Sequence, residues 1–126
     1  MSKQKRKGDA YERELAAYLR DNLGVNCHRA PLSGGGFVLG SGGADLVGTP
    51  LLFVEAKRVE KVSVRDALRQ ANRNKVETNS PETPIVITRQ NRMTTGESLV
   101  VLTLDDFLPF YRAALEKDGY VAQPPE

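Results

Sequence analysis

Residues 51–58 read Leu-Leu-Phe-Val-Glu-Ala-Lys-Arg, and this stretch decides the fold. It is almost wholly apolar up to Glu55, which is typical of a central strand that is covered on both faces. Alternate residues of a strand point to the same side, so Glu55 and Lys57 share a face and Ala56 points to the other. Such charges are costly to bury unless they pair or bind a metal ion. For the triplet alone, a simple ion pair at a strand end is the better interpretation.

Helical and strand patterns alternate on both sides of this stretch. The expected elements are helices over 8–22, 62–79 and 104–119 and strands over 25–30, 44–48, 51–58, 85–88 and 98–103. A strand, a helix and a second strand in this order imply a parallel pair joined by a crossover. We therefore predict an α/β fold, with a mixed sheet of about five strands flanked by helices.

Length and composition limit the class of protein. The 126 residues fit one domain spanning 1–126, with a mobile basic arm over 1–7, a glycine-rich loop over 31–43 and a tail over 120–126. No unbroken apolar run is longer than the five residues Leu15–Leu19, and no long apolar stretch follows the N-terminal charges, so we expect a cytoplasmic protein without a membrane span. Cys27 and His28 are the only residues of their types, which excludes a disulfide scaffold and a cysteine-based zinc site. Carboxylates, lysines and hydroxyls must carry any chemistry.

Positive charge gathers in the first two thirds of the chain. Residues 57–92 carry nine basic and four acidic side chains, whereas residues 93–126 carry two basic and six acidic ones. Arg65, Arg69 and Arg73, spaced by four, form a basic stripe on the helix expected over 62–79. One positive face of this kind attracts polyanions, nucleic acid first among them. An ordinary solvated surface remains the alternative.

Two further carboxylates can join Glu55. If the chain turns near Thr49, Asp45 lies across from Val54 and beside Glu55, where two carboxylates, a backbone carbonyl and water suit Mg²⁺ or Mn²⁺. A lysine beside such an ion can hold the attacking water. Glu12 follows on the first helix. The alternatives are a turn or cap role for Asp45 and an acid placed by the helix dipole for Glu12.

A resemblance to a known family rests on four motifs in order. They are Lys7-Gly8 with Glu12-Arg13-Glu14-Leu15, then Arg29-Ala30-Pro31 with Ser33-Gly34, then Asp45-Leu46, and then Val54-Glu55-Ala56-Lys57. This series resembles the archaeal-type Holliday junction resolvases of the PD-(D/E)XK nuclease superfamily. The motifs cover roughly the first half of the chain, and Ala44 stands where the motif name has proline.

The resemblance implies a restriction-endonuclease-like fold, a homodimer, and Mg²⁺ as the cofactor, with Mn²⁺ as a possible substitute. It also implies a role in DNA recombination and repair, either in a prokaryote or in a virus within its host cell. Glu12, Asp45, Glu55 and Lys57 match the catalytic set, and Ser33 matches a serine of the mobile catalytic loop. The expected metal ligands are Glu12, Asp45, Glu55 and the Ala56 carbonyl. The expected DNA-binding residues are Lys5, Arg6, Lys7, Arg13, Arg29, Ser33, Gly34, Arg58, Arg65, Arg69 and Arg73.

Several alternatives stay open at this point. The chain could be another PD-(D/E)XK nuclease of a repair, nicking or restriction type, a non-catalytic DNA-binding module of the same fold, or a basic α/β protein whose Glu55 and Lys57 only pair. The apolar loop residues Phe37, Val38 and Leu39 could wedge into a junction, exchange across a dimer or pack on their own subunit. For Phe107, Phe110 and Tyr111, core packing is favoured over a dimer interface.

Overall fold

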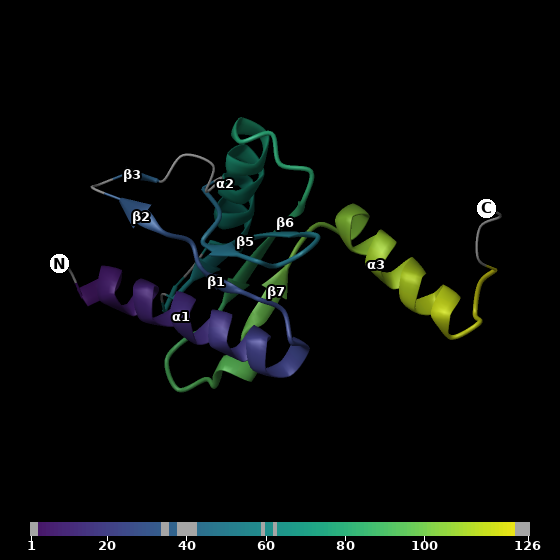
Figure 1. The fold of residues 1–126 in the computed structure, drawn as a ribbon, viewed down its shortest axis with the longest axis horizontal. Helices are drawn as coiled ribbons and strands as arrows, with labels where there is room; N and C mark the ends of the chain where they lie inside the picture. The colour runs from purple at the N-terminus through teal and green to yellow at the C-terminus, as the bar shows by residue number, and fades with distance from the viewer. Residues whose placement is uncertain (1–2, 34–35, 38–42, 59, 62, 123–126) are drawn as a thin grey trace.

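A computed structural model describes residues 3–33, 36–37, 43–58, 60–61 and 63–122 of the chain. Its elements run in the order α1 (Lys3–Leu23), β1 (His28–Arg29), β2 (Leu32–Ser33), β3 (Gly36–Phe37), β4 (Leu46–Val47), β5 (Leu52–Lys57), α2 (Val64–Glu77), β6 (Thr83–Thr88), the 3₁₀ turn η1 (Thr95–Glu97), β7 (Leu99–Val101) and α3 (Leu104–Lys117) (Figure 1). In these parts of the chain, no helix is both long and apolar enough to cross a bilayer.

The main sheet has the strand order β5-β6-β7. β5 and β6 run parallel, with Glu55 paired to Val86 and Lys57 to Thr88, whereas β6 and β7 run antiparallel. The sheet is mixed and α2 is the crossover between its parallel strands, so the predicted α/β class is confirmed. Two short antiparallel pairs, β1-β4 and β2-β3, complete the strands of the described residues.

Two helices cover opposite faces of the main sheet. Tyr11, Leu15 and Ala16 of α1 form one buried cluster with Val54 of β5 and with Ile85 and Ile87 of β6. Ala67 and Ala71 are the buried residues of α2, which packs against β5 and β6 on the other face. Because strand side chains alternate, the face of β5 under α2 is the one that carries Phe53, Glu55 and Lys57.

Gly48 fixes the turn between β4 and β5. Its φ is +80°, a conformation that side chains other than glycine rarely adopt, and an added Cβ would lie 2.0 Å from the carbonyl oxygen of Asn26. The amide of Leu52 closes the turn on the carbonyl of Thr49 at 3.0 Å. As a result, the amide of Asp45 donates to the Val54 carbonyl at 2.8 Å, as the sequence predicted.

Three expected boundaries were wrong. Residues 3–7, expected as a mobile arm, form the first turns of α1, because Lys, Gln and Arg are good helix formers and no breaker precedes Gly8. The glycine-rich loop contains the short β2-β3 pair, although residues 34–35 and 38–42, with Val38 and Leu39, lie outside the described residues. β6 begins at Thr83 and includes Pro84, which does not interrupt the ladder to β7 because that ladder starts at Val86.

Candidate active site

Glu55 and Lys57 lie at the end of β5, on the face that α2 covers. Glu55 is only 5% exposed, and its Oε1 lies 3.4 Å from Nζ of Lys57. Its second oxygen, Oε2, is buried and has no hydrogen-bond partner among the described residues. Burial raises the pKa of Glu55, and the ammonium group of Lys57 opposes that rise only in part. An ion pair alone therefore leaves half of this carboxylate unsatisfied.

Asp45 lies beside this pair, held between two strands. Its carbonyl accepts from the amide of Ala30 at 2.8 Å, while its own amide donates to Val54. The side chain reaches β5 as well, because Oδ2 accepts from the amide of Ala56 at 2.7 Å. Burial, followed by the negative charge of Glu55, raises the pKa of Asp45 from 3.8 to about 7. The carboxylate of Glu55 is thus near enough to disfavour the ionisation of Asp45.

Glu12, on α1, is turned toward a cation rather than toward the other two carboxylates. Nε of Arg29 donates to its Oε1 at 2.7 Å, and NH2 of Arg29 donates to Oδ1 of Asp9 at 2.6 Å. The negative charge of Glu12 nevertheless raises the pKa of both Asp45 and Glu55. Glu12 is therefore close enough to Asp45 and Glu55 to interact with them electrostatically, while its own carboxylate is hydrogen-bonded to Arg29.

The donor set fits a divalent cation at Asp45 and Glu55. In the described parts of the chain, no group of three or more His, Cys, Asp or Glu side chains is arranged as a ready metal cage. However, a buried carboxylate oxygen without a partner and a neighbouring carboxyl group with a raised pKa are what a bound cation would satisfy. Carboxylate and carbonyl oxygens are the ligands that Mg²⁺ and Mn²⁺ prefer. Glu12 would have to leave Arg29 to join them.

The residues expected to contact DNA fall into three groups. Arg65, Arg69 and Arg73 are exposed along α2, on the side of the sheet to which Glu55 and Lys57 point, and Arg69 pairs with Asp66 at 2.7 Å. Arg29 and Arg58 are engaged within the protein, Arg29 as above and Arg58 through Oδ1 of Asn91 at 2.8 Å.

The remaining candidates belong to α1 and the glycine-rich loop. Arg6 and Arg13 are exposed on α1 and Lys7 is half-buried. Ser33 lies in β2, but its side chain, that of Lys5 and the whole of Gly34 lie outside what the structure describes. Of the candidates, Arg6, Arg13 and the three arginines of α2 are the ones whose side chains are described as exposed.

Two residues that the sequence analysis missed organise α1 around the site. Asp9 is the second partner of Arg29, and its spacing of three from Glu12 puts both acids on one face of the helix, which is a signal the sequence does carry. Arg89 joins α1 to the end of β6: NH2 pairs with Glu14 at 2.8 Å, and its guanidinium lies 5.5 Å from the centre of the Tyr11 ring. No sequence signal links residues so far apart.

Comparison with known proteins identifies a family to which the chain is similar. A family model described as "Phage putative PDDEXK endonuclease" matches residues 3–122. No curated protein and no solved structure matches the chain. The match confirms the superfamily that the four sequence motifs predicted, and it does not extend to junction resolution.

Proposed function

The chain belongs to this family of phage PDDEXK endonucleases, and from that premise we propose that it cuts four-way DNA junctions with Mg²⁺ as its cofactor. Nucleases of this superfamily use divalent metal ions. The observation that carries the proposal is the buried Glu55 at the end of β5, with the carboxylate of Asp45 and the ammonium group of Lys57 beside it.

Asp45, Glu55 and the Ala56 carbonyl would hold the ion, with Glu12 joining directly or through water. When bound, the ion supplies Lewis acidity at the scissile phosphate and a water of lowered pKa. Lys57 donates a hydrogen bond that orients the attacking water in line with the bond to be broken. The new P–O bond forms to this water, the P–O3′ bond breaks, and the leaving 3′ oxygen takes up a proton. The products are a 5′-phosphate and a 3′-hydroxyl.

The choice of substrate rests on charge and symmetry. The exposed arginines of α2 contact phosphates, which positions DNA without reading its sequence. A four-way junction has two-fold symmetry and needs two symmetric nicks, so the active form in this proposal is a homodimer with one site per subunit. A nuclease of the same family that cuts other DNA structures is the second candidate, because the family match names no junction.

Cleavage of a matched substrate panel tests the proposal. A labelled four-way junction, a flap, a nicked duplex and a plain duplex of the same sequence are incubated with the purified protein in Mg²⁺, in Mn²⁺ and in EDTA. We expect cleavage of the junction by paired nicks, with none in EDTA. Equal cutting of all four substrates would favour the second candidate, and activity in EDTA would overturn the role of the metal ion.

Glu55→Gln and its control separate a nuclease from a binding module. Glu55→Gln should lower cleavage at least about a hundredfold, because a lost carboxylate ligand is worth several kcal/mol of transition-state stabilisation. Its affinity for the junction should stay within about threefold of the wild type. Glu77→Gln removes an exposed acid at the end of α2 and should leave both quantities unchanged. Junction binding without cleavage by the wild type would indicate a non-catalytic module.

A further inference from the structure

α3 presents an apolar face that the other described residues leave uncovered. Leu104 is 71% exposed, Leu108 48% and Tyr111 50%, and no residue of the helix is buried by the described part of the chain. Figure 1 shows the helix projecting away from the sheet, beyond the end of β7. The expectation that Tyr111 serves core packing was therefore wrong. Apolar patches of this kind mark interaction sites.

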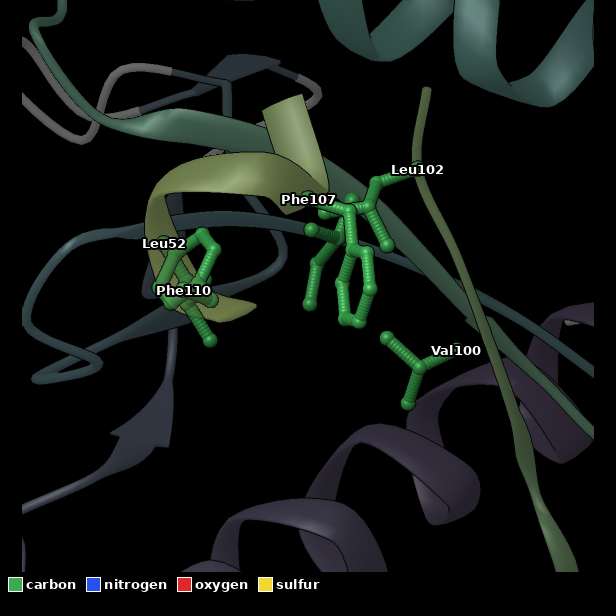
Figure 2. Close-up of a pocket in the computed structure, with 6 residues that line it drawn as sticks. Leu52, Val100, Leu102, Phe107 and Phe110 are labelled. Carbon is green, nitrogen blue, oxygen red and sulfur yellow. The ribbon is translucent and has the colours of Figure 1, made fainter. Parts of the chain in front are cut away.

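The contact of α3 with its own sheet uses a different side of the helix. Figure 2 shows Phe107 and Phe110 reaching from the first turns of α3 toward Leu52, Val100 and Leu102, where they line a cavity of about 310 Å³. This cavity lies at the start of β5, whereas Glu55 and Lys57 lie at its end. Phe107 and Phe110 thus line the space between the helix and the sheet, while Leu104, Leu108 and Tyr111 stay exposed.

The outer side carries a stripe with a self-complementary spacing. We define the stripe as Leu104, Leu108, Tyr111 and Leu115, whose separations of four, three and four residues keep them on one helix face. The order of these separations is the same when the helix is read backwards. An antiparallel copy of α3 therefore places Leu104 opposite Leu115 and Leu108 opposite Tyr111, which is the geometry of an interface with two-fold symmetry.

The charges on α3 favour the same orientation. Asp105 and Asp106 lie in the first turn, and Arg112 lies farther along the helix, where its NH1 is 3.9 Å from Oε1 of Glu116. In an antiparallel pair, Asp105 of one copy lies near Arg112 of the other. The guanidinium group of Arg112 then forms ion pairs with Glu116 of its own helix and with Asp105 of the second helix. A parallel pair would instead align the acidic first turns of both copies, which is unfavourable.

We propose that the stripe of α3 pairs antiparallel with the stripe of a second copy of this chain. Tyr111 is already ordered for this contact, because its ring stacks on that of Phe107 with 5.8 Å between the ring centres. The inference goes beyond the proposed function, because it names an assembly surface and stands whichever DNA structure the protein cuts.

Mixing two single-cysteine variants tests the register. Leu104→Cys and Leu115→Cys are each oxidised alone and then as a mixture, and covalent dimers are counted on a non-reducing gel. Residues 104 and 115 are separated by about 16 Å along the helix, so an antiparallel pair bonds efficiently only in the mixture. The wild type, whose only cysteine is the buried Cys27, should form no covalent dimer. Efficient bonding of Leu104→Cys with itself would indicate a parallel pair, and no bonding in the mixture would contradict the proposal.

Sedimentation equilibrium tests the surface itself. The wild type should be dimeric at micromolar concentration, and Leu108→Glu should raise the dissociation constant at least about thirtyfold, because each dimer buries two copies of this residue. Leu108 is half exposed in the single chain, so the variant should fold, which circular dichroism checks. Leu23→Glu, an exposed leucine at the end of α1, is the matched control and should remain dimeric. A monomeric wild type, or a Leu108→Glu variant that stays dimeric, would overturn the proposal.

Discussion

Oδ2 of Asp45 accepts a hydrogen bond from the backbone amide of Ala56 at 2.7 Å. This hydrogen bond ties the carboxylate that follows the glycine-rich loop to the strand that carries Glu55 and Lys57. It also lowers the pKa of Asp45, although burial and the charge of Glu55 outweigh it. The backbone therefore holds the site together, although burial and the charge of Glu55 disfavour the ionised form of Asp45.

The raised pKa of Asp45 predicts that the stability of the metal-free protein depends on pH. The pKa of Asp45 is about 7 in the folded chain and near its ordinary value of 3.8 when unfolded, so the folded state binds the proton more tightly. The stability that this group contributes is fully present below pH 4 and is lost as the pH rises through 7. Relative to Asp45→Asn, the free energy of unfolding of the wild type in EDTA should fall by a few kcal/mol between pH 4 and 8.

Urea unfolding of both proteins across this range measures the difference. Adding Mg²⁺ at pH 8 should restore stability to the wild type and have much less effect on Asp45→Asn, because a ligand that binds only the folded state stabilises it. A difference that stays constant from pH 4 to pH 8 would show that Asp45 ionises normally.

Gly48 offers a prediction about how the site is positioned. Gly48→Ala should destabilise the protein by several kcal/mol, because the new Cβ would lie 2.0 Å from the Asn26 carbonyl and the φ of +80° is unfavourable. Gly24 is the matched control, since its φ is +73° but nothing lies within 4 Å of an added Cβ. Gly24→Ala should cost only about 1 kcal/mol. Thermal unfolding compares the two, and equal losses would mean that the close approach to Asn26 relaxes easily.

Local pattern was sufficient to predict the strand that carries Glu55 and Lys57. The alternation along β5 places Glu55 and Lys57 on one face, and the short connection to β4 places Asp45 across from Val54, because each relationship depends on a few neighbouring residues. The cap of α3 is equally local, because Oγ1 of Thr103 accepts from the amide of Asp106, three residues farther along the chain, at 3.1 Å.

Relationships between distant elements could not be predicted in this way. The approach of Arg29 to Glu12 depends on how α1 crosses β1, and the sequence suggested DNA phosphates as the partner of Arg29 instead. The apolar face of α3 was visible in the periodicity of its residues, but periodicity does not tell which surface covers a face. The β2-β3 pair was missed because glycine-rich segments have little strand propensity.

The two ion pairs of Arg29 predict that it supports the fold of the site. Arg29→Met removes the ion-pair partner of Glu12 and one partner of Asp9, and the free energy of unfolding at pH 7 should fall by roughly 1–3 kcal/mol because charge-assisted hydrogen bonds are broken. The double variant that adds Glu12→Gln should recover part of this stability, since the carboxylate that lost its ion pair with Arg29 is then neutral. Arg69→Met, which breaks the exposed pair with Asp66, should change stability by no more than about 0.5 kcal/mol. If Arg29→Met weakened DNA binding without any loss of stability, its main role would be to bind phosphate.

The stripe of Arg65, Arg69 and Arg73 on α2 predicts how DNA binding responds to salt. These side chains are exposed along α2, the helix that covers the face of the sheet carrying Glu55 and Lys57, and in this prediction each neutralises one phosphate. Replacing all three with glutamine should weaken binding of every DNA structure, and should reduce the slope of log K against log salt concentration by about 0.9 for each phosphate that is no longer neutralised. The triple variant should still cleave DNA at low salt when the substrate is saturating, because the residues proposed to hold the metal ion and the water are intact. Lys117→Gln removes one positive charge from the last turn of α3, which projects away from this face, and should leave the slope unchanged (Figure 1). An unaltered slope in the triple variant would place the DNA on another face of the protein, with α1 and its exposed Arg6 and Arg13 as the next surface to test.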